Sequence, residues 1–380
     1  MRLIQTPLMR LAGLAAGLIL ACAVLAGPAA AKPFTARTAA GLDRALSSSL
    51  GTTWAPGAIV GVWQGNRAWT ATRGLTRRGG GTRPTRAFHT RVGSVTKTFT
   101  GTLILQLVDE GKLRLDQTID EWFPTFPNAK GITVYQLGTM ASGIASYTLD
   151  SAVSSRYFAA PTAPWAPMQL IDAAAGLPSV FAPGNGFQYS NSNFVMLGQI
   201  VEQVTGQSFA TALRQRILRP LGLRDTSYPS GTSVPSRTLH GYTTQGSANG
   251  DVIDATRWSP TFASAAGQMI STLDDLRVWT RVLGRGTLLK PATQRLRLRP
   301  NPASVGGGRS YDFAIGTDHG WLAHDGALPG YNSQIAYFPK RDISIVVLTN
   351  ADIAGSAGTA APAIFRALAK VVTPGNLPTR

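Results

Sequence analysis

The order of the expected secondary-structure elements constrains the fold of this chain more than any other feature of its sequence. Short runs rich in β-branched and aromatic residues, typical of strands, occur near both ends of the chain, whereas helical periodicity dominates between them. The runs are residues 58–63 and 67–72, joined by Gln-Gly-Asn, and residues 312–315, 334–338 and 343–348. We therefore expect an α+β fold, in which an antiparallel β-sheet formed from both chain ends is flanked by helices and encloses a large inserted, mainly helical region.

Helical periodicity also predicts one helix near each end of the chain, at residues 38–50 and 360–372. The helices of the inserted region are expected at residues 94–110, 133–140, 167–175, 191–205, 208–217 and 272–283. The last of these begins with a threonine cap and is expected to end at Gly284.

A chain of 380 residues suits one large domain with an ample core. We expect a single domain over residues 32–376. Its sheet part would comprise about residues 35–83 and 305–375, and its helical part about residues 84–304.

The first 31 residues predict a secretory signal peptide. Arg2 and Arg10 form a basic start, residues 11–26 form an apolar run, and residues 29–31 are alanines suited to cleavage. An uncleaved membrane anchor is a less favoured alternative, because the run is short for a span. A lipoprotein acylated at Cys22 is less favoured still, because Leu20 is bulky for the acylation motif and further apolar residues follow Cys22. We expect a secreted or periplasmic protein without a stable membrane span once the signal is removed.

Composition and charge exclude several classes of protein. The 44% of hydrophobic residues is too high for a disordered chain. The single cysteine cannot form an internal disulfide or a cysteine-rich zinc site, and the four histidines show no H-E-x-x-H spacing. The net charge of +17 is consistent with a nucleic acid or an anionic surface as partner. For an exported protein we expect no nucleic-acid partner. Solvated arginines are the favoured explanation of the charge, with anionic cell-envelope polymers as the alternative.

The segment Gly93-Ser94-Val95-Thr96-Lys97 is the most informative one for chemistry. Ser94 and Lys97 are three residues apart at a helix start, so they share one face. The helix N-terminus favours an alkoxide-like nucleophile and lowers the pKa of the ammonium group, and a buried neutral lysine can deprotonate a serine. The alternative is a serine cap with a solvated Lys97. The apolar turn that follows argues for burial.

Tyr189-Ser190-Asn191 provides a second set of polar groups at the start of a predicted helix. Tyr189 could carry a proton and Asn191 could bind an amide. Alternatively, Asn191 or Ser192 merely caps the helix.

His324-Asp325-Gly326-Ala327 is the third segment. A glycine such as Gly326 within a strand often marks the close approach of another backbone. The N–H groups of Ala327 and Ser94 could then form an oxyanion hole. The alternative is a surface turn with a solvated histidine.

Ser-x-x-Lys, Tyr-x-Asn and His-x-Gly in this order resemble the motifs of the penicillin-recognising serine hydrolases: the DD-peptidases, the class C β-lactamases and their esterase and D-aminopeptidase relatives. The set is most similar to the secreted Streptomyces-type D-alanyl-D-alanine carboxypeptidases. Further stretches, such as ITVYQLGTMASGI and AAGQMISTLDDL, extend the resemblance over roughly residues 35 to 370. The resemblance implies a β-lactamase/transpeptidase-like fold.

The resemblance also implies a two-step acyl-enzyme mechanism without metal or cofactor. Ser94 would be the acylated nucleophile, Lys97 would assist its deprotonation and Tyr189 would relay a proton to and from the leaving group. The backbone N–H groups of Ser94 and Ala327 would form the oxyanion hole.

The substrate-binding groups implied by the resemblance are Asn191 for the substrate amide, His324 for orienting the hydroxyl–phenol network, and the strand at Asp325 and Gly326. Phe262 would provide an aromatic wall where the carboxypeptidase branch has tryptophan.

Two positions depart from that branch, in which an arginine and a threonine bind the terminal D-Ala carboxylate. Gly316 stands at the position of the arginine and Asp325 at that of the threonine. An anionic Asp325 should repel a substrate carboxylate if it points into the site. Alternatively it faces away, because neighbouring residues of a strand alternate.

The resemblance therefore implies a secreted serine hydrolase, D-alanyl-D-alanine carboxypeptidase-like on peptidoglycan peptides and reactive with β-lactams. Its departures leave open an esterase, a D-amino-acid amidase or aminopeptidase, or a class C-type β-lactamase. A catalytically inactive envelope-binding protein is the distant alternative, against which the intact Ser94, Lys97 and Tyr189 argue.

Overall fold

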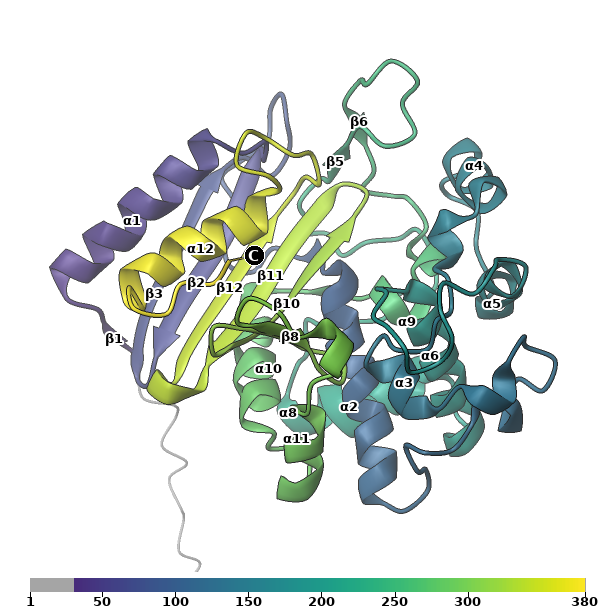
Figure 1. The fold of residues 1–380 in the computed structure, drawn as a ribbon. Helices are drawn as coiled ribbons and strands as arrows, with labels where there is room; N and C mark the ends of the chain where they lie inside the picture. The colour runs from purple at the N-terminus through teal and green to yellow at the C-terminus, as the bar shows by residue number, and fades with distance from the viewer. Residues whose placement is uncertain (1–30, 380) are drawn as a thin grey trace, which may run out of the picture. The chain divides into compact units, whose positions relative to one another are not determined.

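The computed structural model describes residues 31–379, and within them an eight-stranded sheet lies between two groups of helices (Figure 1). The strand order is β1-β3-β2-β12-β11-β10-β9-β8, so strands from the two ends of the chain meet at the β2–β12 pair. Neighbouring strands are antiparallel, except that the short edge strand β1 pairs with β3 in parallel. The predicted α+β architecture, with a sheet formed from both chain ends, is confirmed.

The strands of this sheet form two groups along the chain. They are β1 (Lys32–Pro33), β2 (Gly57–Gln64), β3 (Arg67–Gly74), β8 (Arg309–Tyr311), β9 (Gly316–Asp318), β10 (Trp321–Leu328), β11 (Tyr331–Phe338) and β12 (Ile343–Thr349). Two further pairs are β4 (Thr90–Arg91) with β7 (Ile270–Ser271), and β5 (Tyr242–Thr243) with β6 (Ile253–Asp254).

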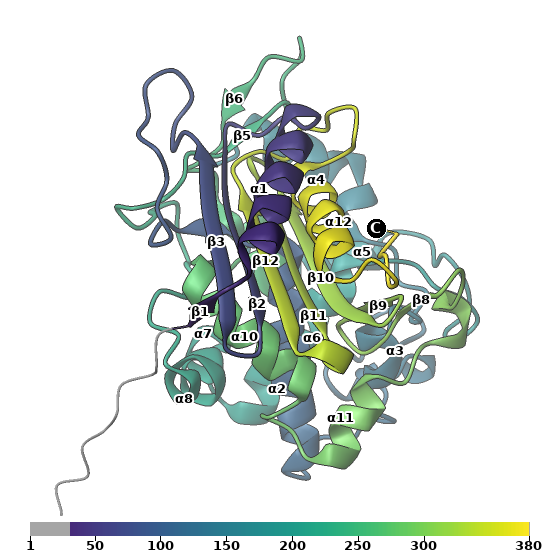
Figure 2. The ribbon, with the colours of Figure 1, turned by 90° about the vertical axis from the view of Figure 1, so that its left-hand side faces the viewer.

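The helices are α1 (Ala36–Gly51), α2 (Thr96–Asp109), α3 (Val134–Gly138), α4 (Ser151–Ala159), α5 (Pro167–Ala175), α6 (Asn191–Thr205), α7 (Phe209–Leu213), α8 (Arg219–Leu221), α9 (Ser264–Gly267), α10 (Leu273–Arg285), α11 (Pro291–Arg297) and α12 (Ala360–Val372). Figure 2 shows α1 and α12 against one face of the sheet, while α10 and α2 lie on the other side.

The central strands are buried on both faces, because helices cover each of them. In β2, Val60 and Val62 belong to the core beneath α1 and α12, whereas Ile59 and Trp63 belong to the core shared with the helical region. The alternation of side chains along a strand explains this division. A strand covered on both sides needs a nearly continuous apolar sequence, and the β2 sequence GAIVGVWQ provides it.

The expected strand at residues 312–315 is wrong. This segment is the turn between β8 and β9, closed by a hydrogen bond from the Asp312 N–H to the Ile315 carbonyl. Phe313 is fully buried against α3, and Ala314 has a φ of 61°. Packing of Phe313 into the helical core therefore overrides the β-propensity of the run.

The expected end of a helix at Gly284 is also wrong. Helix α10 continues to Arg285, and Gly286 is the left-handed cap. An ideal Cβ on Gly284 would lie 2.1 Å from the ring of Tyr337, so Gly284 allows the helix to pack against β11 instead of ending it. Helices α4, α8, α9 and α11 were not predicted.

The predicted signal peptide and Cys22 lie outside the described residues, except for Ala31. Among residues 31–379, no helix combines the length and the hydropathy needed to cross a membrane. The predicted domain limits and the division near residues 84 and 304 stay predictions.

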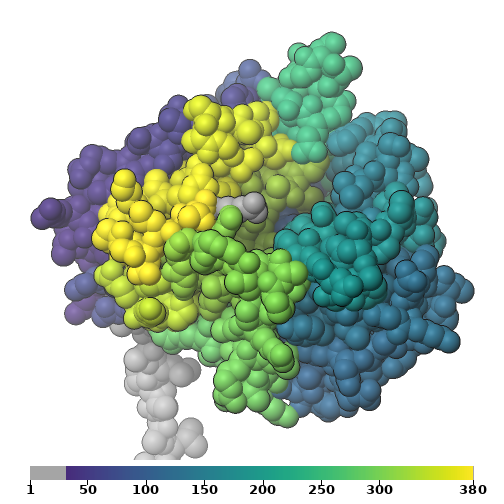
Figure 3. Space-filling model, in the orientation of Figure 1, coloured from purple at the N-terminus to yellow at the C-terminus, as the bar shows by residue number. Residues whose placement is uncertain are grey.

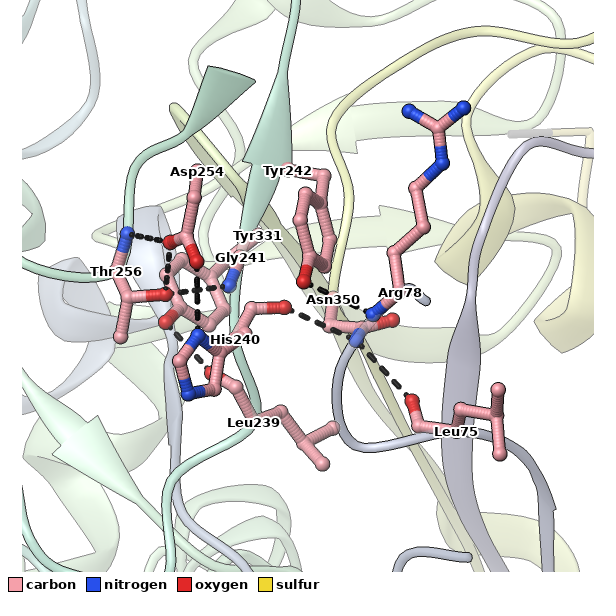
Figure 4. A network of polar contacts seen from close by, with 10 residues as sticks. All are labelled: Leu75, Arg78, Leu239, His240, Gly241, Tyr242, Asp254, Thr256, Tyr331 and Asn350. Carbon is pink, nitrogen blue, oxygen red and sulfur yellow. Dashed lines mark hydrogen bonds and ion pairs between the residues drawn. The ribbon is translucent and has the colours of Figure 1, made fainter. Parts of the chain in front are cut away.

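A buried polar network joins the loop before β5 to the end of the sheet (Figure 4). Asn350 follows β12 and has no exposed surface. Its side chain accepts from the Gly57 N–H at 2.6 Å and donates to the carbonyls of Leu75 and His240 at 3.4 and 3.0 Å. Tyr331 donates to a carbonyl of the same loop at 2.8 Å. One amide thus satisfies backbone groups from three separate segments.

Replacement of Asn350 by alanine is expected to lower the free energy of unfolding by about 2–4 kcal/mol, because buried backbone groups lose their partner. Urea denaturation measures this loss. Asn249→Ala, in an exposed loop, is the matched control and should leave the midpoint unchanged. Equal midpoints for the two variants would contradict a structural role for the network.

Candidate active site

Ser94 lies in a short 3₁₀ turn, Gly93–Val95, immediately before α2 and not in its first turn as predicted. Gly93 has a φ of 52°, in the left-handed region that glycine adopts without strain. An ideal Cβ on Gly93 would lie 2.7 Å from the Ala327 nitrogen, and one on Gly326 would lie 3.0 Å from the Ser94 nitrogen. The turn and β10 therefore touch backbone to backbone, which brings the two predicted oxyanion-hole segments together.

Lys97 is in the first turn of α2 and has no exposed surface. Its Nζ lies 3.0 Å from Ser94 Oγ, 2.8 Å from Asn191 Oδ1 and 2.8 Å from the Ala266 carbonyl oxygen. Burial lowers the pKa of Lys97 to about 7, although the carboxylate of Asp325 raises it in part. The alternative of a solvated lysine is wrong, and a substantial fraction of Lys97 is neutral near pH 7.

Asn191 is the first residue of α6, and its side chain points to Lys97 and not back to the helix end. Its Nδ2 also lies 3.4 Å from Ser146 Oγ. The cap position is Ser190, whose side chain makes no capping bond, and the Ser192 hydroxyl donates to a backbone carbonyl at 2.9 Å. The capping alternative for Asn191 and Ser192 is therefore wrong.

Tyr189 is half-buried beside the same two residues. Its ring centroid is 4.9 Å from Lys97 Nζ, and its hydroxyl forms a hydrogen bond with Ser94. Burial raises the pKa of Tyr189 well above its usual value, and the hydrogen bond with Ser94 opposes this in part. The phenol therefore keeps its proton at neutral pH and can donate it.

His324 is buried, so the alternative of a solvated histidine in a surface turn is wrong. Its Nδ1 faces the Asp325 carbonyl at 2.6 Å and therefore donates, which leaves Nε2 to accept from the Tyr311 hydroxyl at 3.1 Å. Burial lowers the pKa of His324 well below its usual value, which keeps the ring neutral. The edge of the Tyr311 ring meets Tyr189, with centroids 6.1 Å apart. His324 thus contacts the phenol network through Tyr311.

A cleft of about 1010 Å³ is lined by Ser94, Tyr189, Asn191, Tyr311 and His324. The surface is hollowed between the yellow C-terminal segments and the teal helical region in Figure 3. Phe262 forms the predicted aromatic wall. Its ring stacks on that of Tyr157, with the two centroids 3.9 Å apart. The rings of Tyr147 and Trp165 are roughly perpendicular to it, with centroid distances of 5.3 and 5.5 Å.

Asp325 lines the cleft with an exposed side chain, and its negative charge raises the pKa of Lys97. Asp325 lies on the face of β10 opposite to His324, toward α12, as the alternation of strand neighbours predicts, but the cleft extends along this face and Asp325 lines it. Gly316 on β9 lines the cleft as well and offers no cation there. Arg309 on β8 and Arg366 on α12 lie elsewhere along its walls.

The sequence analysis missed three contributors: Tyr311, Ser146 and the carbonyl of Ala266. Ser146 lies two residues after the stretch ITVYQLGTMASGI, and Ala266 lies within AAGQMISTLDDL. Both stretches carried the family resemblance, so that signal could have identified the two residues. Nothing in the sequence pairs Tyr311 with His324. No group of three or more potential metal-ligating side chains occurs in the part of the chain that the structure describes.

Comparisons with known proteins agree with this geometry. The beta-lactamase family profile matches residues 42–369. Penicillin-binding protein 4 of Amycolatopsis lactamdurans is 29% identical over 325 residues, which are 79% of this chain and 82% of that protein.

Two solved structures have the same fold. The D-stereospecific amidohydrolase from Streptomyces sp. has a TM-score of 0.77 at 32% identity, covering 86% of this chain and 97% of that one. The D-amino acid amidase from Ochrobactrum anthropi SV3 has a TM-score of 0.78 at 23% identity, and the match covers 88% of this chain and 97% of that one. The chain therefore belongs to the beta-lactamase family and is a serine hydrolase, which confirms the family predicted from the motif order.

Gly326→Ala is expected to lower kcat/KM for an activated ester by at least roughly 10²-fold, since one displaced oxyanion donor costs that much. The added Cβ would lie 2.0 Å from the Val92 carbonyl oxygen, so β10 must move away from Ser94. Far-UV circular dichroism checks that the variant is folded. Gly231→Ala, where an ideal Cβ meets nothing within 4 Å, is the control and should keep full activity. A folded, fully active Gly326→Ala protein would contradict the close approach.

Proposed function

We propose that this protein is an amidohydrolase that cleaves amides and peptides of D-amino acids through an acyl-enzyme on Ser94. The contact between Ser94 Oγ and a buried Lys97 whose pKa is near 7 carries the proposal. It pairs a nucleophile with a base that can lose its charge at the pH of the reaction.

The mechanism follows from the positions of the side chains. Neutral Lys97 takes the proton of Ser94 as Oγ attacks the substrate carbonyl, and the Ser94 and Ala327 N–H groups stabilise the oxyanion. Tyr189 delivers its proton to the leaving nitrogen and is reprotonated by the Lys97 ammonium, which returns both residues to their starting states. Asn191 binds the substrate amide, and water then releases the acyl group. His324 positions Tyr311, which packs against Tyr189.

Two observations favour an amidase over the carboxypeptidase implied by the motif resemblance. The cleft presents the carboxylate of Asp325, and Gly316 provides no cation, so a terminal carboxylate is poorly accommodated there. The 32% identical relative of known structure is a D-stereospecific amidohydrolase.

A second candidate is a D-alanyl-D-alanine carboxypeptidase that binds β-lactams. The similarity to Penicillin-binding protein 4 over most of both chains favours it. For either activity we propose export by a signal peptide over residues 1–31, which would place the enzyme beside the peptidoglycan.

A substrate panel separates the candidates. We expect hydrolysis of D-phenylalanine amide, slower or no hydrolysis of the L-enantiomer and little release of D-Ala from a D-Ala-D-Ala peptide. Ser94→Ala, which removes the nucleophile, should abolish each activity. Efficient D-Ala release together with a stable fluorescent-penicillin adduct would favour the carboxypeptidase. No turnover and no adduct with any substrate would overturn both.

The pH dependence of kcat/KM tests the role of Lys97. Protonated Lys97 cannot act as a base, so kcat/KM should fall about tenfold per pH unit below the pKa of about 7 and level off above it. A neutral ester is the substrate of choice, because it carries no titrating group of its own. Lys97→Arg, which stays charged, should be inactive across the range. If kcat/KM does not change between about pH 5.5 and about pH 9, deprotonation of Lys97 is excluded from the mechanism.

A further inference from the structure

Asp325 is an unpaired carboxylate that lines the cleft. Its side chain is exposed on β10, two residues before Ala327, and among residues 31–379 it has neither a hydrogen bond nor an ion pair. The other acidic side chain that lines the cleft, Asp318, is engaged by Thr379 and His319.

The polar side chains around Asp325 form their hydrogen bonds with other groups. Lys97 Nζ contacts three acceptors, none of them Asp325. The His324 ring uses one nitrogen for a backbone carbonyl and the other for Tyr311. Gln334, directly opposite Asp325 in the β10–β11 ladder, donates its amide to a backbone carbonyl. Among residues 31–379, no cationic side chain therefore forms an ion pair with this carboxylate.

The cationic residues of the cleft do not change this. Arg309 on β8 and Arg366 on α12 line its walls, but neither forms an ion pair with Asp325 within the described part of the chain. The negative charge of Asp325 raises the pKa of both Lys97 and Tyr189, so the carboxylate lies close to the reacting atoms. A carboxylate near the scissile bond favours a cation and disfavours an anion on the bound substrate.

We propose that Asp325 binds a free ammonium group of the substrate next to the scissile bond. The proposal rests on the proposed function, and it narrows the substrate class to D-amino-acid derivatives with an unblocked amine. The amine can come from the acyl residue itself or from the leaving group. Residues two apart on a strand are about 7 Å apart, so the Asp325 side chain can reach either side of a carbonyl held at Ala327.

Two matched pairs of substrates test the ammonium contact. The acyl-side pair is D-phenylalanine p-nitroanilide and 3-phenylpropionic p-nitroanilide, which lacks only the amine. The leaving-side pair is the 2-aminoethylamide and the propylamide of N-acetyl-D-phenylalanine. For the pair whose amine meets Asp325, kcat/KM should favour the ammonium substrate by about tenfold or more.

Variants then assign the preference to the carboxylate. In Asp325→Asn the ratio of kcat/KM within that pair should fall to about one, and Asp325→Glu should keep part of it. The ratio cancels any effect of the substitution on Lys97, because both members of a pair use the same base. Asp172→Asn, on the exposed surface of α5 and outside the cleft, is the control and should keep the wild-type ratio.

The outcome also distinguishes this proposal from the proposed function. A preference lost in Asp325→Asn for either pair supports the ammonium contact and identifies the source of the amine. Ratios near one for both pairs in the wild-type enzyme, with normal acylation of Ser94 by a neutral ester, would overturn the contact alone. Absence of acylation by every substrate would overturn the proposed function itself.

Discussion

The burial of Lys97 is the interaction on which the rest of the site depends. A lysine without exposed surface is costly unless its nitrogen finds partners, and here these come from the turn before α2, from α6 and from α9. The same burial brings its pKa to about 7. Packing of three helical segments around one amine therefore creates both the geometry and the chemistry of the nucleophile.

The second constraint is the close approach of β10 to the turn that holds Ser94. Gly93 and Gly326 leave no room for a side chain between these segments, which are more than 200 residues apart in the chain. The sheet makes the approach possible, because β10 is paired with β11, and β11 with β12 at the centre. The Ala327 N–H is thus held by the buried sheet, while Ser94 and its base Lys97 are held by the helical region.

Asp325 gives this enzyme its own electrostatic character. A neutral His324 and a Lys97 with a lowered pKa leave little positive charge in the centre of the cleft, so the exposed carboxylate dominates there. This is the physical reason why we propose amidase chemistry, and with it an ammonium-bearing substrate, and not the carboxypeptidase activity that the motifs alone imply.

The sequence by itself determined the features that depend on neighbouring residues. The β2–β3 hairpin, the helices α5, α6 and α12, and the spacing of Ser94 and Lys97 were all predictable, because period and turn chemistry act over one hairpin or one helical turn. Tertiary structure decided the rest. Residues 312–315 form a turn because Phe313 enters a distant core. The pKa of Lys97 is lowered because segments that include α6 and α9 bury it, and Asp325 lines the cleft because the cleft extends toward α12. Each of these outcomes depends on burial and on partners far away in the chain, and a single sequence does not specify those partners.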